Sequence, residues 1–187
     1  MNNKEIYIKL EKAVGDNNVQ EVSNILDQHS DLDLNDENLY TLHPPLCRAA
    51  KKGFYEICKT LIQYGADVNC IKDRLFSPLW GASSGNHLEI VKLLIENGAD
   101  INAYESSTTA ALNEVAAKGH FEIVRYLIEK GADINRLTTT LLFSPLDWSI
   151  SSGHNEISLF LKEKGALSNI NHDYVWSEVG GGISQHV

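Results

Sequence analysis

The sequence has few of the residues that mark secreted, membrane-spanning or metal-binding proteins. Only three of its 187 residues are cysteines, and Cys47, Cys58 and Cys70 lack the spacing of metal ligands. Because an odd number of thiols cannot pair completely, we expect free thiols in a reducing cytoplasm. No apolar run approaches the roughly 20 residues of a membrane span, and the N-terminus has no apolar stretch of signal-peptide length. We therefore expect a cytoplasmic protein without a membrane partner.

Positive charge is also scarce. The chain has 16 lysines and arginines against 25 acidic residues, and its net charge is −9. Direct binding to nucleic acid needs a basic face that contacts phosphates, so the composition argues against it. The negative charge favours a protein partner with a basic surface, or it serves solubility alone. Both interpretations remain open at this point.

Catalytic motifs are missing as well. The sequence contains no G-x-S-x-G elbow, no glycine-rich phosphate loop and no H-E-x-x-H helix. The three consecutive glycines at 180–182 do not open a helix, so they do not indicate a phosphate site. We expect no enzymatic activity, no catalytic residue and no cofactor.

What the sequence does contain is a repeat. A segment that reads N-H-L-E-I-V-K-L-L-I-E-N-G-A-D-I-N in its clearest copy occurs four times, at residues 53–69, 86–102, 119–135 and, in eroded form, 153–169. The closing glycines of these copies are separated by 33, 33 and 34 residues. A second pattern precedes each copy, such as P-L-C-R-A-A-K-K-G from Pro45. A fixed period in this range indicates a stacked array of repeats.

The combined unit resembles the ankyrin repeat, whose pattern runs T-P-L-H-x-A-A-x-x-G-H-x-E-I-V-x-x-L-L-x-x-G-A-D-x-N. The resemblance is strong over residues 39–169 and loose before them. It implies an all-α fold, a solenoid of about five helix-turn-helix repeats with short hairpin-like fingers. Because ankyrin arrays serve unrelated roles, the function has to be argued from the variable surface.

The period also predicts the domain organisation. We expect one ankyrin-repeat domain over residues 1–169 and a partly flexible tail over 170–187. The repeats are placed at about 1–38, 39–71, 72–104, 105–137 and 138–169. The two end repeats are eroded, as expected of caps with one wetted face. Leu93 is expected to be buried in the middle of the stack, and Leu159 to matter less near the cap.

Three histidines recur at one repeat position, and they are the strongest candidates for a metal site. His87, His120 and His154 would form a column in a stacked array. Neighbouring repeats are about 10 Å apart, whereas imidazoles that share a zinc ion each approach it to about 2 Å. We therefore interpret them as turn histidines and expect no metal site. Directly before His87, Asn86 stands where other repeats have glycine, and we expect it to take a left-handed conformation.

The variable surface predicts where a partner binds. In ankyrin arrays the finger tips and the exposed side of the first helices usually make these contacts. Here the tips lack glycine, so their hairpins are expected to be remodelled. Trp80 and Trp148 are expected to frame a notch at the small residues 81–85. The predicted partner-binding residues are Tyr40, Arg48, Lys52, Arg74, Phe76, Trp80, Ser84, Tyr104, Glu114, Lys118, Phe143, Asp147, Trp148 and Ser152.

Exposed aromatic residues beside charged ones are typical of protein-binding surfaces. The alternative is that Phe76, Trp80 and Phe143 pack beneath neighbouring fingers. The array is similar to the immunity proteins encoded beside bacterial secreted toxins. That similarity implies an inhibitor that binds a basic toxin such as a nuclease, as a monomer or in a one-to-one complex. A general scaffold, an adaptor or a host-directed ankyrin protein remains the alternative.

Overall fold

The computed structural model confirms the all-α prediction. It describes residues 2–36, 38–39, 43–70, 76–103 and 110–169, which contain ten α-helices and no β-strand. The predictions for Tyr40, Arg74, Tyr104 and the tail lie outside these residues. The chain forms two compact units, Met1–Ser107 and Thr108–Val187. We describe each unit by itself, and the single domain over 1–169 stays a prediction.

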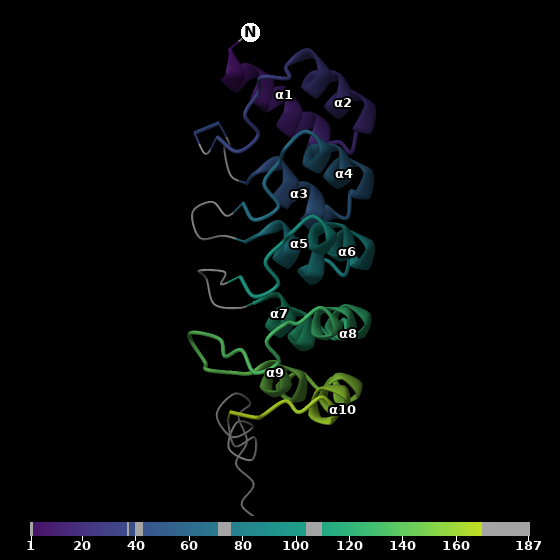
Figure 1. Ribbon diagram of the computed structural model, residues 1–187, viewed down its shortest axis with the longest axis vertical. Helices are drawn as coiled ribbons and strands as arrows, with labels where there is room; N and C mark the ends of the chain where they lie inside the picture. The colour runs from purple at the N-terminus through teal and green to yellow at the C-terminus, as the bar shows by residue number, and fades with distance from the viewer. Residues whose placement is uncertain (1, 37, 40–42, 71–75, 104–109, 170–187) are drawn as a thin grey trace, which may run out of the picture. The chain divides into compact units, whose positions relative to one another are not determined.

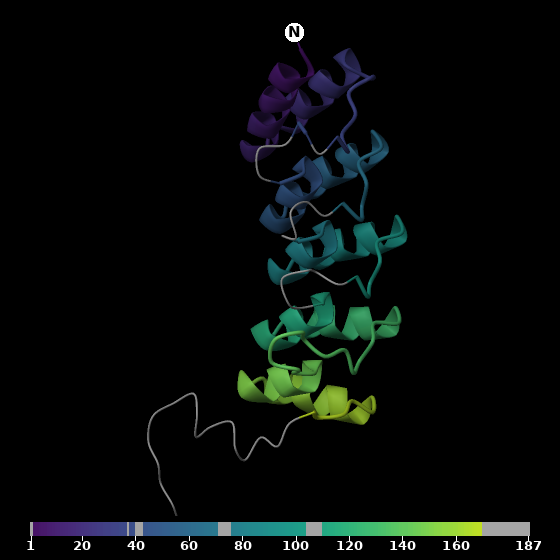
Figure 2. The same ribbon diagram turned by 90° about the vertical axis from the view of Figure 1, so that its left-hand side faces the viewer.

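The first unit consists of three helical hairpins. Its helices are α1 (Asn3–Gly15), α2 (Val19–Gln28), α3 (Pro45–Lys52), α4 (Tyr55–Gln63), α5 (Pro78–Ser84) and α6 (Leu88–Glu96). Within this unit α1, α3 and α5 form one row, the inner helices, and α2, α4 and α6 form a second row beside it, the outer helices (Figures 1 and 2). The array therefore buries its core both within each hairpin and between successive hairpins.

Helical periodicity decides which residues form this core. Leu10, Leu61 and Leu94 are fully buried, each on the apolar face of its helix. The expectation for Leu93 is wrong, because Leu93 is only half-buried and Leu94 next to it has no exposed surface. One residue along a helix turns the side chain by about 100°, so the two leucines point to different surroundings.

The second unit repeats the architecture with two hairpins. Its helices are α7 (Ala111–Lys118), α8 (Phe121–Glu129), α9 (Pro145–Ser151) and α10 (Asn155–Glu163). Here α7 packs on α9, and these are the inner helices of the unit. Likewise α8 packs on α10, and these are its outer helices (Figure 1). The side chain of Leu159 on α10 is 63% exposed, which agrees with its expected minor role in the core.

Tight turns within the hairpins depend on left-handed residues. Gly53 and Gly119 end α3 and α7 with φ angles of 80° and 81°. Asn86 takes the same place after α5 with φ 60°, which confirms its predicted conformation. Asparagine is among the few non-glycine residues that enter this region readily, so the turn keeps its geometry.

Two of the recurring histidines, His87 and His154, lie at the turn before the second helix of their hairpin, as interpreted from the sequence, and their rings contact backbone of the preceding hairpin. The ring of His87 lies 3.2 Å from the carbonyl oxygen of Lys51, near the end of α3 in the preceding hairpin. In the second unit His154 lies 3.0 Å from the carbonyl oxygen of Ala117 at the end of α7. Both rings satisfy carbonyl groups that a helix end leaves without an intrahelical donor.

The asparagines of the G-A-D-x-N turns join successive hairpins in the same way. Asn69 donates its side-chain amide to the carbonyl oxygen of Gly98 at 3.0 Å and accepts the amide of Asp100 at 2.8 Å. Asn35 makes the equivalent two bonds to Gly65 and Asp67. These bonds hold neighbouring turns in register, so the recurrence of asparagine has a structural cause.

Candidate functional site

One position of the first helix of each repeat from the second onward lies close to a finger base in the cases where its contacts are known. It is the residue after the Pro-Leu or Ala-Leu pair, occupied by Cys47, Trp80, Asn113 and Asp147. In the second unit Asn113 donates its side-chain amide to the carbonyl oxygens of Arg136 at 2.9 Å and Phe143 at 3.2 Å. This amide bridges the two ends of the finger between α8 and α9, so the residue type at this position determines how the finger is held.

Asp147 fills this position on α9 and is not available to a partner. Its side chain is fully buried, and its carboxylate accepts hydrogen bonds from Ser144, Ser168 and Asn169. Burial by itself would raise the pKa of Asp147, but these hydrogen bonds outweigh it and leave the pKa below its ordinary value. The prediction that Asp147 contacts a partner is therefore wrong, because its carboxylate is used within the chain.

Phe76 is also buried, with 8% of its surface exposed. Its ring centroid lies 4.7 Å from that of His43 and 5.5 Å from that of Trp80, and Lys51 places its ammonium 4.6 Å from the ring centre. For Phe76 the alternative of packing beneath a neighbouring element is correct. Phe76 supports Trp80, whose side chain is half-buried and keeps part of its surface accessible.

Helix α3 presents three cations next to this aromatic cluster, and one of them, Lys51, contacts Phe76. Arg48, Lys51 and Lys52 lie on α3, and among the described residues none of them pairs with a carboxylate. Arg48 packs against Gly15 and donates a 3.5 Å hydrogen bond to the carbonyl oxygen of Glu11. The pKa of His43 is lowered by burial first and then by the positive charges of Lys51 and Arg48. This face of α3 is cationic and aromatic, and it suits the carboxylate or carbonyl groups of a partner.

The other predicted site residues of the first unit lie nearby in the chain. Lys52 is exposed at the end of α3, with its ammonium 5.7 Å from the ring centre of Phe54. Ser84 is half-buried at the end of α5. Gly81 has no space for a side chain, because an added Cβ would lie 3.3 Å from atoms of Lys51 and Phe76. The small residue here is thus explained by packing of α5 against α3.

In the second unit the predicted residues fall into three groups. Glu114 and Lys118 form an ion pair of 3.2 Å along α7. Phe143 and Trp148 are half-buried, with ring centroids 5.1 Å apart. Ser152 is exposed directly after α9. Trp80 and Trp148 belong to different units, so the notch between them stays a prediction.

The finger between α8 and α9 ends in exposed apolar residues. Leu141 and Leu142 are 53% and 54% exposed, and Leu142 has a left-handed backbone with φ 54°. The amide of Leu142 donates to the carbonyl oxygen of Thr138 at 3.1 Å, and its own carbonyl accepts the side chain of Asn169 at 2.8 Å. A leucine in this region is strained, and such strain is typical of functional positions.

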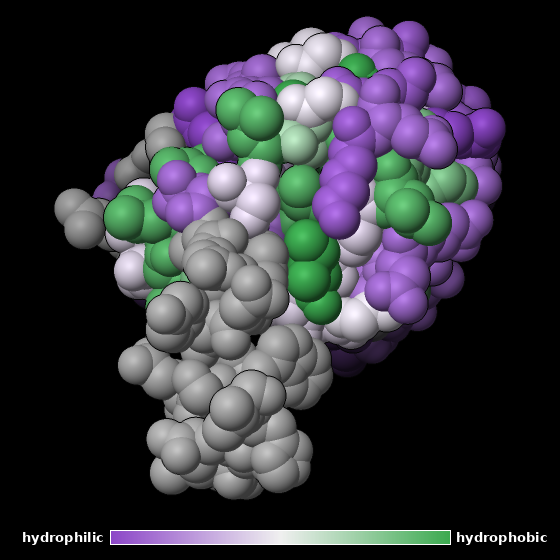
Figure 3. Space-filling model, turned by 90° about the horizontal axis from the view of Figure 1, so that it is seen from below, coloured by the Kyte–Doolittle hydropathy of each residue, from purple (hydrophilic) through white to green (hydrophobic). Residues whose placement is uncertain are grey.

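In this finger, a leucine and not a glycine takes the positive φ, so the tip keeps a left-handed residue although it lacks glycine. The predicted partner-binding residues do not include Leu141 and Leu142, although the tip sequence L-L-F is apolar. Hydrophobic side chains are visible among polar ones on the surface seen from below (Figure 3). Among the described residues of the second unit, the exposed large apolar side chains are Leu141, Leu142, Leu159 and Leu167.

The recurring carboxylates lie on the outer helices, and not at the finger tip that carries the exposed leucines. Glu56, Glu89, Glu122 and Glu156 stand in the first turns of the outer helices, as expected for groups that interact with the helix dipole. Two of them form surface ion pairs, Glu89 with Lys92 and Glu122 with Arg125. Such exposed pairs contribute little to stability. The acidic character of the chain therefore lies largely on the outer helices and turns.

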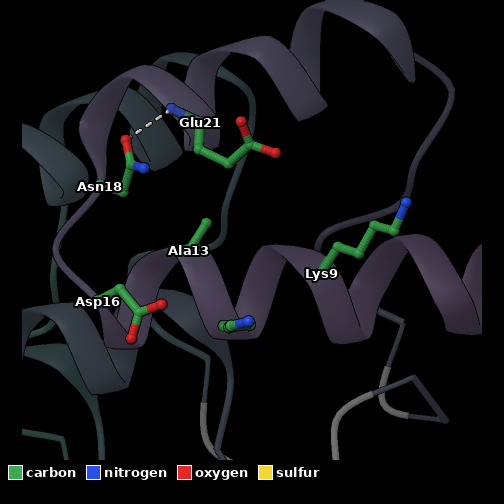
Figure 4. Close-up of a pocket in the computed structure, with 6 residues that line it drawn as sticks. Lys9, Ala13, Asp16, Asn18 and Glu21 are labelled. Atoms are coloured by element: carbon green, nitrogen blue, oxygen red, sulfur yellow. Dashed lines mark hydrogen bonds between the residues drawn. The ribbon is translucent and has the colours of Figure 1, made fainter.

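A shallow pocket of about 370 Å³ lies between α1 and α2 (Figure 4). Its polar lining carries mixed charges from Lys9, Lys12, Asp16 and Glu21. The side chain of Asn18 is occupied there by the amide of Glu21, 3.0 Å away, at the start of α2. The pocket shows no convergent set of groups for one ligand.

Metal and membrane binding gain no support from the part of the chain that the structure describes. It contains no group of three or more histidine, cysteine, aspartate or glutamate residues arranged to hold a metal ion. None of its helices combines the length and the apolar character needed to cross a bilayer.

Comparisons with known proteins agree with the repeat pattern. A family model for ankyrin repeats in three copies matches residues 10–105 and 105–172. A protein of Rickettsia bellii (strain RML369-C), named as an ankyrin repeat protein, is 39% identical over 67 residues. That match covers 34% of this chain and 39% of the relative, so it spans well under half of either protein.

Proposed function

Because the chain belongs to the ankyrin-repeat family, whose arrays are protein-binding modules, we propose that it acts without enzymatic chemistry by covering the surface of a partner protein. In its most specific form the proposal is an immunity-type inhibitor. Such an inhibitor binds a cognate bacterial toxin, for example a basic nuclease, and blocks its active site. It would act in the cytoplasm, as a monomer that forms a one-to-one complex.

The observation that carries the proposal is the tryptophan-centred surface on each unit. In the first unit Trp80 rests on the buried ring of Phe76, near the cations of α3, for which the described residues provide no carboxylate partner. In the second unit Trp148 packs on Phe143, next to the exposed tip leucines. Supported, partly exposed tryptophans beside arginine or apolar residues are the groups that dominate binding energy at protein interfaces.

The charge distribution of the chain favours a partner whose surface carries both basic and acidic groups. The net charge of −9 and the carboxylates of the outer helices would speed the encounter with a basic protein. The face of α3 is cationic, so it would contact carboxylate or carbonyl groups of that partner after docking. The prediction of a basic partner thus concerns long-range attraction, whereas the contacts at α3 need acidic groups.

The proposal can be tested by affinity capture with the full chain from a lysate of the native cells. The captured protein is then purified, and its affinity is measured by calorimetry with Trp80→Ala and Lys52→Glu variants. Lys59→Glu on α4 is the matched control, because it changes the net charge equally on the outer row. We expect Lys52→Glu to weaken binding at least tenfold and Lys59→Glu to leave it within about twofold.

An activity measurement separates the inhibitor from the alternative. For an immunity protein, one equivalent of the chain abolishes the activity of the captured partner, and co-expression removes its toxicity. A partner that stays active in the complex would indicate a scaffold, an adaptor or a host-directed ankyrin protein. A complex that survives both Trp80→Ala and Lys52→Glu would exclude the α3 face as the binding surface.

A further inference from the structure

Two of the three cysteines lie in contact. The Sγ atoms of Cys47 and Cys70 are 3.5 Å apart, although 23 residues separate them. Cys47 lies on α3, and Cys70 follows the G-A-D-V-N turn after α4. The Sγ atom of Cys47 also lies 3.4 Å from the carbonyl oxygen of Phe76 and 3.6 Å from that of Cys70.

Cys47 occupies the same repeat position as Asn113 in the second unit, but it carries a thiol where Asn113 carries an amide. The equivalent residue in the second unit, Asn113, joins the two ends of its finger through strong amide hydrogen bonds. A thiol is only a weak donor, so Cys47 holds the corresponding ends loosely by comparison. Its direct neighbour, however, is a second thiol, with which it can form a covalent bond that asparagine cannot.

We propose that Cys47 and Cys70 are a redox-responsive pair that forms a disulfide by exchange with a low-molecular-weight disulfide such as oxidised glutathione. This modification site goes beyond the proposed binding function and does not depend on it. Closing the bond requires the two sulfur atoms to approach from 3.5 Å to about 2.05 Å, which a rotation of the side chains or a small backbone shift supplies.

The difference in exposure assigns the two roles in the exchange. Cys70 is partly exposed and Cys47 is buried, so the reagent reaches Cys70 first. The Cys70 thiolate attacks one sulfur atom of oxidised glutathione, and one glutathione thiolate leaves. The Cys47 thiolate then attacks the Cys70 sulfur of the mixed disulfide and displaces the second glutathione. In total two protein thiols are oxidised to one disulfide, and one glutathione disulfide is reduced to two thiols. The two leaving glutathione thiolates take up, through solvent, the two protons that the protein thiols lose.

Cys58 provides an internal control. It is fully buried on α4, and burial raises the pKa of its thiol to about 12. Because the thiolate is the reactive form, Cys58 stays reduced while the chain is folded. The odd number of cysteines therefore divides into one pair and one inert thiol.

The structural consequence falls at the edge of the candidate binding surface. A Cys47–Cys70 bond would fasten the end of the turn after α4 to the helix that carries Arg48, Lys51 and Lys52. It would close a loop within the first unit and so restrict the unfolded chain. The oxidised form should therefore resist chemical unfolding more than the reduced form.

The test uses the folded full chain in glutathione buffers of graded oxidised-to-reduced ratio. After an acid quench, free thiols are alkylated, and the intact mass and peptide map are recorded without reductant. The alkylation is carried out in denaturant, so that the buried Cys58 also reacts. We expect a monomer that carries one alkyl group, at Cys58, and is otherwise two hydrogen atoms lighter than the reduced chain. Cys47→Ser should stop at a mixed disulfide on Cys70, Cys70→Ser should stay fully reduced, and Cys58→Ala should behave as the parent chain.

Other outcomes would overturn the proposal. They are three alkylated thiols at every ratio, a mixed disulfide at Cys70 that persists in the parent chain, or covalent dimers that grow with protein concentration. The peptide map of the parent chain decides the question by itself if a variant fails to fold. Repeating the exchange in concentrated urea should make Cys58 reactive, which shows that folding and not sequence selects the pair.

Discussion

The carboxylate of Asp147 accepts a 2.6 Å hydrogen bond from the hydroxyl group of Ser168, 21 residues further along the chain. It also accepts the amide of Asn169 at 3.0 Å and closes a capping box with Ser144 at the start of α9. One buried charge thus fastens the beginning of α9 to the segment that follows α10. This role explains why aspartate occupies a position where the ankyrin pattern has histidine.

The first prediction concerns the pH dependence of this charge. The folded pKa of Asp147 lies below its ordinary value of 3.8, so its contribution is fully present above about pH 4 and is lost as the pH falls through the folded pKa. Asp147→Asn should lower the free energy of unfolding by roughly 1–3 kcal/mol at neutral pH. Urea unfolding followed by circular dichroism should show the gap to the parent chain shrinking at about pH 3. A gap of equal size at both pH values would contradict the assignment.

The second prediction separates two neighbouring leucines on α6. Leu94→Ala removes a fully buried side chain and should cost about 2–5 kcal/mol of unfolding free energy. Leu93→Ala truncates a half-buried side chain and should cost clearly less, and Leu159→Ala should change stability by about 0.5 kcal/mol or less. Chemical denaturation of the three variants measures the order. Equal losses for Leu93 and Leu94 would show that the register of α6 differs from the structure.

The third prediction couples a turn glycine to a histidine. A Cβ atom at Gly53 would lie 2.5 Å from Cε1 of His87, and the φ angle of 80° disfavours alanine independently. Gly53→Ala should therefore cost more than the roughly 1–2 kcal/mol of the left-handed conformation alone. Gly65→Ala is the matched control, because its φ is 86° and the space around it is empty.

A double-mutant cycle isolates the contact between the two residues. In a His87→Ala background the clash is absent, so Gly53→Ala should cost about as much as Gly65→Ala. His87→Ala by itself should cost about 1 kcal/mol through the lost bond to the carbonyl of Lys51. Strict additivity of the two substitutions would show that the ring does not lie over Gly53.

The fourth prediction tests whether strain at the finger tip serves binding. Leu142→Gly removes the strain of a positive φ, worth roughly 1–2 kcal/mol, and adds about 0.5–1 kcal/mol of chain entropy. Stability should stay equal or rise by up to about 1 kcal/mol, while affinity for the captured partner falls. Leu141→Gly has only the entropic cost, so it should lower both stability and affinity. Unchanged affinity in both variants would remove the tip from the binding surface.

Much of the fold was predictable because the repeats carry the same local signals. Proline at the first helical position marks the starts of α3, α5 and α9, and the left-handed residues Gly53 and Asn86 mark the inner turns. The spacing also placed the recurring histidines and asparagines at turns, whereas their contacts with the neighbouring hairpin became known only from the structure. These features depend on residues within one repeat or the next. Because the sequence is periodic, the same local signal has the same structural role in each repeat.

The candidate site was less predictable, because partial burial depends on which surfaces meet in space. Phe76 and Trp80 are four residues apart and both aromatic, yet Phe76 is buried and Trp80 keeps accessible surface. Asp147 was placed among partner contacts because its hydrogen-bond donors at 168 and 169 are distant in the sequence. Likewise the tip leucines became candidates only when their exposure and the backbone of Leu142 were known.

The sequence by itself determined that this chain is an ankyrin-repeat array, how its hairpins begin and turn, and that its net charge is acidic. Periodicity and turn chemistry are local properties, so they can be read along the chain. Three relationships depend on how the helices pack: α3 presents cations near Trp80 that have no carboxylate partner among the described residues, Asp147 bonds within the chain, and Cys47 contacts Cys70. In each case the groups lie on separate segments and come into contact only when the helices stack. Their spacing in the sequence does not indicate how close they lie in space.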